Sequence, residues 1–181
     1  MQFRFNEART LQAIAELLRR HSVPRMNYMR LLKLLYIADR EMLATHALPI
    51  TGDAVVAMER GPVLSHTYDL LRANEGAWAK FLHKDHYDVM LLRDPGKGQL
   101  SKAIVAKLQE VSDRYQDMDE WDMVEETHKL AEWQKNFPPG SNSSHPIRWE
   151  DVLIAQGKAD LIAEVEKDER ASAMFDEVFG R

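Results

Sequence analysis

The chain has 181 residues, of which 45% are hydrophobic and 29% are charged, with a net charge of −5 and no cysteine. This composition is typical of a globular protein, and the sequence has no run of about 18 apolar residues that could cross a membrane. The lack of cysteine excludes disulfides, thiolate metal sites and cysteine nucleophiles. Charge begins at Arg4, too early for a signal peptide. We therefore expect a single cytoplasmic domain over residues 1–181.

The charge is unevenly distributed along the chain. Residues 1–48 carry eight Lys/Arg against four Asp/Glu, whereas residues 117–126 carry six acidic residues and no basic one. The overall acidity argues against general affinity for nucleic acid, although the N-terminal part is basic. An acidic segment favours a basic protein partner. The alternative is a solvated helix face.

The first predicted helix covers residues 7–21, with Asn6 as its N-cap. The second begins near Asn27 and ends before Pro49. Apolar residues cover most of its circumference, so we expect a central helix packed by several neighbours. Only a narrow strip of it is assigned to solvent: Arg30, Lys33, Arg40 and Glu41.

Two short strands are predicted in the next part of the chain. Residues 54–58 are rich in Val and Ala, and residues 87–92 contain Tyr87, Val89 and Leu91 in alternation. The two strands are candidates to pair into a small antiparallel sheet. Between them, Gly61-Pro62 is expected to open a third helix, because proline suits a first helical turn.

The remaining segments are predicted to be mainly helical. A helix begins near Ser101, another spans residues 119–134, and a Pro- and Ser-rich loop covers residues 136–146. A short helix at 149–156 and a terminal helix at 159–179 follow. The predicted fold class is mainly α (α+β): one compact domain of six or seven helices around the central apolar helix, with a small antiparallel β element.

No catalytic pattern is found. Gly96-Lys97-Gly98 lacks the first glycine and the Ser/Thr of a phosphate loop. His83 and His86 would offer a metal two ligands on one helix face, but in a strand they point to opposite sides. His128 shares an apolar face with Trp121 and is read as a structural histidine bonded to backbone or a hydroxyl. We expect no catalytic residue, no metal and no cofactor.

The four tryptophans are candidates for core or interface anchors. Trp78 follows the turn-like residues 74–77, so it is expected to be the exposed one. Trp121 and Trp133 lie in the helix predicted for 119–134.

Several motifs occur in order and resemble one known family. They are Lys33-Leu34-Leu35-Tyr36-Ile37-Ala38-Asp39, Pro49-Ile50-Thr51-Gly52-Asp53, Gly61-Pro62-Val63, Thr127-His128 and Trp133. Over residues 10–155 the chain resembles the SocA-like antitoxin, or Panacea, domain, which also occurs in phage-associated proteins. In some relatives a proline precedes the tryptophan, whereas here the residue is Glu132.

The resemblance implies an antitoxin that neutralises a cognate toxin by direct protein contact, with the toxin encoded by an adjacent gene. One alternative is a proteolytic adaptor that delivers the toxin to a bacterial protease. A metal-dependent hydrolase, from another class, has little support. The motif residues are interpreted as scaffold: Lys33, Leu34, Leu35, Tyr36, Gly61, Pro62, Thr127, His128 and Trp133.

Partner choice must then depend on surface residues outside the motifs, since the family binds different toxins on one fold. Acidic residues interleaved with a large apolar one could cover a basic toxin site. The candidate partner-binding residues are Asp119, Glu120, Trp121, Glu125, Glu126 and Trp78.

Overall fold

The computed structural model describes residues 1–179, with side chains throughout that range except at 169, 172–173 and 175–179. Within this range the chain forms eight α-helices, two short 3-10 helices and two three-stranded antiparallel sheets. The predicted fold class, mainly helical with small antiparallel sheets, is confirmed. The second sheet was not expected. No helix in the described range is long and apolar enough to cross a membrane.

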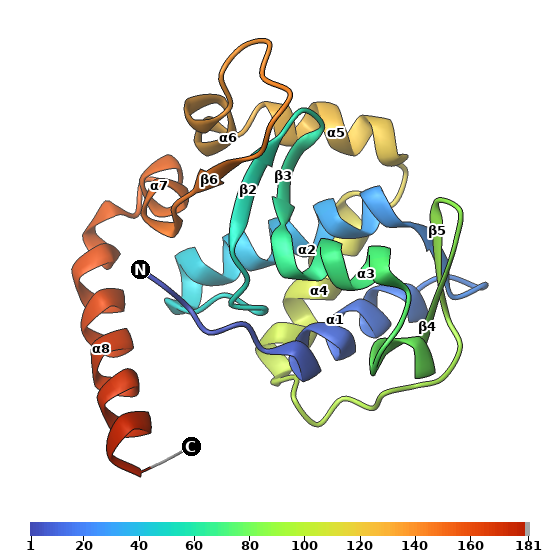
Figure 1. The fold of residues 1–181 in the computed structure, drawn as a ribbon, viewed down its shortest axis with the longest axis horizontal. Helices are drawn as coiled ribbons and strands as arrows, with labels where there is room; N and C mark the ends of the chain where they lie inside the picture. The colour runs from blue at the N-terminus through green and yellow to red at the C-terminus, as the bar shows by residue number, and fades with distance from the viewer. Residues whose placement is uncertain (180–181) are drawn as a thin grey trace.

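The helix α2 (Tyr28–His46) lies at the centre of the fold, as its all-round apolar surface predicts (Figure 1). The side chain of Asn27 caps its first turn by accepting a hydrogen bond from the Met29 N–H, and Ala47 ends it in the left-handed conformation. Its principal helical neighbours are α1 (Glu7–Arg19), α4 (Lys102–Arg114), α5 (Glu120–His128) and α7 (Trp149–Ala155).

The strands form two sheets whose membership differs from the prediction. One has the order β3 (Gly61–Leu64), β2 (Val55–Met58), β6 (His145–Ile147), and the other β1 (Arg25–Asn27), β5 (Asp88–Leu91), β4 (Leu82–Asp85). The expected pairing of 54–58 with 87–92 is therefore wrong. Each strand instead pairs with its neighbour in a tight hairpin, which closes a much shorter loop.

Gly61 and Pro62 do not open a helix. They begin β3, and α3 starts later, at Ser65–Ala73. Pro62 is tolerated because β3 is an edge strand of its sheet, where proline's missing N–H can be accommodated. The predicted helix over 119–134 is also wrong in its extent, since α5 ends at His128 and α6 covers Ala131–Asn136.

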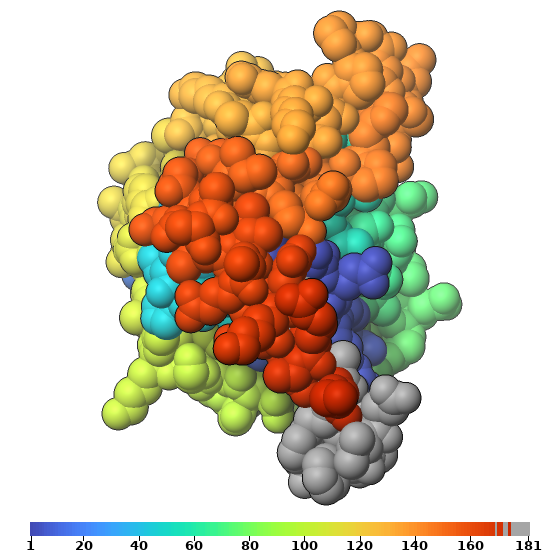
Figure 2. Space-filling model, turned by 90° about the vertical axis from the view of Figure 1, so that its left-hand side faces the viewer, coloured from blue at the N-terminus to red at the C-terminus, as the bar shows by residue number. Residues whose placement is uncertain are grey.

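The C-terminal part runs through the 3-10 helix η2 (Ala159–Leu161) into α8 (Ile162–Phe179), close to the predicted bounds. Figure 2 shows the α7–α8 segment lying across one face of the molecule, where α7 packs against α2. Val165 on α8 is buried and belongs to the same cluster of buried hydrophobic residues as Leu11 on α1 and Leu35 on α2.

Candidate functional site

Three motif segments that are far apart in the sequence meet at one point. Lys33 extends from α2 toward β3, and its Nζ donates a 2.8 Å hydrogen bond to the carbonyl oxygen of Pro62. Gly61 has a φ of +94°, and a Cβ there would lie 2.6 Å from Thr127 Oγ1 on α5 and 2.9 Å from Lys33 Nζ. Only glycine fits both this conformation and this space.

Lys33 was expected to face solvent, and that expectation is wrong, because its side chain is only 1% exposed. Arg30, also assigned to solvent, is buried as well and donates hydrogen bonds to the carbonyls of Tyr115 and Met118. Burial lowers the pKa of Lys33 to about 7. Within the described residues, the Pro62 carbonyl is the only hydrogen-bond partner of its Nζ. Lys33 is therefore a buried amine held by a single backbone hydrogen bond among the described residues.

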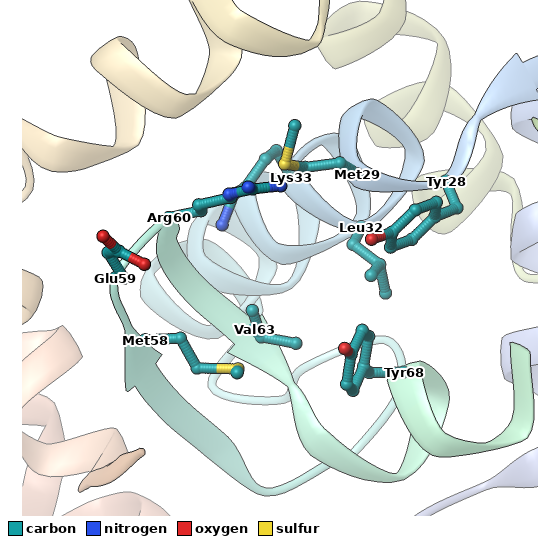
Figure 3. Close-up of a pocket in the computed structure, with 9 residues that line it drawn as sticks. All are labelled: Tyr28, Met29, Leu32, Lys33, Met58, Glu59, Arg60, Val63 and Tyr68. Atoms are coloured by element: carbon teal, nitrogen blue, oxygen red, sulfur yellow. The ribbon is translucent and has the colours of Figure 1, made fainter. Parts of the chain in front are cut away.

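A pocket of about 240 Å³ lies directly against Lys33 (Figure 3). It is formed between the start of α2, the turn that joins β2 to β3, and α3. The residues that line it are Tyr28, Met29, Leu32, Lys33, Met58, Glu59, Arg60, Val63 and Tyr68. Its walls are mostly aromatic and apolar, and its cationic groups are Lys33 and Arg60.

A series of exposed and half-buried aromatic residues extends outward from this pocket. The ring of Tyr28 lies 6.4 Å from the rings of both Tyr68 and Tyr87. On α5, the ring of Trp121 lies 5.2 Å from the guanidinium of Arg60. Tyr87 is 67% exposed and Trp121 is 54% exposed. We call these five residues, Tyr28, Tyr68, Tyr87, Arg60 and Trp121, the aromatic surface.

The acidic segment around Trp121 has partly structural roles. Asp119 and Asp122 form a capping box at the start of α5, with the Asp119 side chain accepting from the N–H groups of Trp121 and Asp122. Glu126 pairs with Lys129 at 2.6 Å. Burial lowers the pKa of Arg30, and the negative charge of Glu120 acts in the opposite direction. The exposed Glu125 has no such structural explanation.

Trp78 contradicts its prediction, and Trp133, one of the scaffold residues of the family motif, is only partly buried. Trp78 is only 3% exposed, packed in the 3-10 helix η1 (Trp78–Lys80), so the expectation of an exposed Trp78 is wrong. The turn before it directs the ring inward against α3 and β4. Trp133 is half-buried rather than fully buried, and its Nε1 donates to the carbonyl of Met58 at 2.9 Å.

His128 is half-buried at the end of α5. Its Nε2 lies 3.0 Å from the carbonyl oxygen of Glu59, and its ring stacks on Trp133 at 4.1 Å. This is the backbone-bonded histidine that the sequence predicts. Together, His128 and Trp133 fix the turn that carries Glu59 and Arg60, and so position one side of the pocket.

Glu132, the residue that replaces the proline of some relatives, is 1% exposed. Its carboxylate accepts from the hydroxyl of Tyr36 at 2.9 Å and from Nε of Arg40 at 2.7 Å. These bonds fasten α6 to α2. Burial, with the charge of Glu132 close by, raises the pKa of Tyr36 well above its ordinary value.

A second polar network holds the Thr51-Gly52-Asp53 motif. Asp39 on α2 accepts from the N–H and the hydroxyl of Thr51. Asp53 accepts from the N–H groups of His66 and Thr67 at 3.0 and 2.8 Å, and thereby caps α3 from a distant part of the chain. Burial raises the pKa of Asp39 to about 7. These acids fasten the 51–53 segment to α2 and α3.

The sequence interpretation missed the pocket and most of the aromatic surface. Tyr28 and Tyr68 were counted only as apolar helix positions, and Tyr87 as part of a strand. Arg60 carries no local signal at all. Among the described residues, no three His, Cys, Asp or Glu side chains are grouped in a way that could hold a metal ion.

The fold and its surface define a small α+β protein with a buried lysine under an aromatic pocket. The model of the "Antitoxin SocA-like, Panacea domain" family matches residues 31–134, more than half of the chain, and the chain belongs to this family. The matched range contains Lys33, Gly61, Pro62, Thr127 and Trp133. No curated protein and no solved structure matches the chain.

Proposed function

We propose that the protein is a cytoplasmic antitoxin that neutralises a cognate toxin, encoded by an adjacent gene, by binding it directly rather than by catalysis. Its membership of the SocA-like antitoxin family supports the toxin–antitoxin role. The observation that favours direct binding is the aromatic surface.

The aromatic surface has the composition of a protein-binding hot spot. Tyr, Trp and Arg dominate the energy of protein interfaces, and such residues gather around pockets that exclude water. Here the exposed Tyr87 stacks on Tyr28 and the exposed Trp121 lies against Arg60, and both Tyr28 and Arg60 line the pocket. Two methionines, Met29 and Met58, line the pocket and add adaptable apolar area.

The mechanism that fits this surface is occlusion. A toxin whose active site or substrate surface lies against the aromatic surface loses access to its target while it is bound. The acidic residues of α5 adjoin Trp121, so a toxin that is basic around its active site would be attracted to this face.

The test is co-expression with the product of the neighbouring gene. We expect that gene to arrest growth alone and the present protein to restore growth while the toxin remains at a constant level. A toxin that disappears when this protein is present would indicate proteolytic delivery instead. Purified toxin that does not bind the purified protein would contradict direct neutralisation.

The aromatic surface is tested with Trp121→Ala and Tyr87→Ala. Each is expected to weaken toxin binding by about 30-fold or more, because hot-spot truncations cost about 2 kcal/mol or more. Ile154→Ala is the matched control, since Ile154 is similarly exposed but lies on α7. Equal affinities for all three variants and wild type would rule this surface out.

A further inference from the structure

The pocket against Lys33 has an unusual chemical character. Most of its lining is apolar or aromatic, but the lining also includes Lys33, whose side chain is almost wholly removed from water. A buried cation is costly unless an anion pairs with it. Within the described residues, no carboxylate forms an ion pair or a hydrogen bond with Lys33.

The other charged and titratable groups around the pocket do not neutralise Lys33. Tyr28 and Tyr68 contribute hydroxyls, Arg60 adds a second cation, and His128 on α5 is bonded to the Glu59 backbone. The single acidic residue that lines the pocket, Glu59, is exposed, and Figure 3 shows its carboxylate at the outer end of the β2–β3 turn. The lining therefore offers an incoming carboxylate two basic side chains, the exposed Arg60 and the buried Lys33, which is only partly protonated at neutral pH.

We propose that this pocket receives an aspartate or glutamate side chain of the partner toxin, with Lys33 as the group that binds its carboxylate. The inference rests on the proposed function, because it identifies the anchor that the toxin would insert beside the aromatic surface. A volume of about 240 Å³ holds one acidic side chain. The tyrosines would cover its methylene groups, and Arg60 would close over the carboxylate.

In this proposal the acidic residues of α5 and the basic residues of the pocket act at different stages of binding. The acidic residues of α5 attract a basic toxin at long range, whereas the pocket accepts a single acidic side chain at short range. Such a pairing fixes the orientation of a partner, because any other docking leaves one group without its counter-charge.

Binding of a carboxylate would also change the protonation of Lys33. With a pKa of about 7, the amine is largely neutral at pH 8 in the unbound protein. A carboxylate in the pocket favours the charged form, so the complex is expected to take up about one proton at pH 8. This uptake is measured by titration calorimetry with the purified product of the neighbouring gene, in phosphate and in Tris at pH 8.

The variant that tests the site is Lys33→Met, which keeps the length of the side chain and removes its charge. We expect it to lose the proton uptake and to bind the toxin about 30-fold more weakly, as for truncation of one partner in a buried charge pair. Lys102→Met, at an exposed lysine on α4, is the matched control and should behave as wild type. In the toxin, one Asp→Asn or Glu→Gln replacement should weaken binding to wild type but not to Lys33→Met.

The outcomes separate this inference from the proposed function. Wild-type binding without proton uptake, or unchanged affinity in a folded Lys33→Met, would overturn the carboxylate site and leave direct neutralisation standing. No binding by wild type would overturn both. The Asp→Asn and Glu→Gln variants of the toxin are measured against the wild-type protein, so they decide the question even if Lys33→Met fails to fold: if none of them binds more weakly, the carboxylate site is overturned.

Discussion

The Nζ of Lys33 donates a hydrogen bond to the carbonyl oxygen of Pro62, which joins the central helix to an edge strand 29 residues away in the sequence. The same amine lies beside Gly61, and Lys33 is one of the residues that line the pocket. One buried lysine thus both secures the β2–β3 hairpin on α2 and sets the charge of the candidate binding site.

The close approach at Gly61 predicts that Gly61→Ala is strongly destabilising. The new Cβ would meet Thr127 Oγ1 and Lys33 Nζ, and alanine is strained at this φ. We expect a loss of about 2–4 kcal/mol in the free energy of unfolding, measured by urea denaturation. Gly96→Ala is the control, because Gly96 also has a positive φ but no atoms within 4 Å of the new Cβ, so about 1 kcal/mol is expected. Equal losses for the two variants would show that the contact at Gly61 is unimportant.

The lowered pKa of Lys33 predicts a dependence of stability on pH. Between pH 7 and the ordinary lysine value of 10.5 the unfolded chain binds more protons at this position than the folded protein. Stability from this group therefore rises with pH across that window and is lost as pH falls toward 7. Relative to Lys33→Met, the wild-type free energy of unfolding should rise by up to about 3 kcal/mol from pH 7 to 9.5. Parallel profiles for the two proteins would show that Lys33 ionises normally.

The buried ion pair of Glu132 with Arg40 predicts a large effect of Glu132→Gln. The change removes a charge that Arg40 and Tyr36 both use. Breaking a buried pair from one side costs about 3–5 kcal/mol, and the partial exposure of Arg40 places the expected loss near the lower end. Glu125→Gln, at an exposed position on the neighbouring α5, should stay within about 0.5 kcal/mol of wild type. A Glu132→Gln melt that overlays the Glu125→Gln melt would contradict this role.

The central position of Leu35 predicts a cavity effect. Leu35 is fully buried on α2, so Leu35→Ala should lower the free energy of unfolding by about 2–5 kcal/mol. Leu48→Ala, at a half-exposed leucine just beyond the same helix, should cost less than about 1 kcal/mol. Similar denaturation midpoints for the two variants would argue against α2 as the core of the fold.

The elements that the sequence predicts well are those with a strong local pattern. The apolar circumference of α2 and the capping residues Asn6, Asn27 and Ser101 place three helices close to their observed bounds. The break between α5 and α6 was missed, because residues 129–130 contain neither proline nor glycine. At this point the direction of the chain depends on a tertiary contact, the hydrogen bond from Trp133 Nε1 to the Met58 carbonyl, rather than on a local sequence preference.

The candidate site was harder to predict, because it depends on contacts between distant segments. A lysine in an apolar helix is ordinarily assigned to solvent, and its burial follows only once Gly61 and Thr127 are known to lie beside it. Similarly, Tyr28 and Tyr87 become neighbours through the pairing of β1 with β5, which no sequence periodicity indicates. The exposed Trp121 was the one member of the aromatic surface that the sequence singled out.

The acidic residues of α5 lead to a last prediction, about the rate at which the toxin is bound. Asp119 and Asp122 are needed to begin the helix, so they are left unchanged. The remaining carboxylates, Glu120, Glu125 and Glu126, surround the exposed Trp121. Replacing all three by Gln removes three charges and retains side-chain size. If these charges attract the toxin, association should slow by about 10-fold at low ionic strength, and its dependence on salt should weaken.

The matched control removes three charges from another face. Asp160→Asn, Glu164→Gln and Asp168→Asn alter exposed residues of η2 and α8, with the same change in net charge. Because attraction between opposite charges falls with distance and with salt, only charges near the bound toxin should matter greatly. Stopped-flow association at low and high salt distinguishes the two triple variants. Equal slowing in both would assign the effect to net charge, and unchanged rates in the α5 variant would remove these glutamates from the binding face.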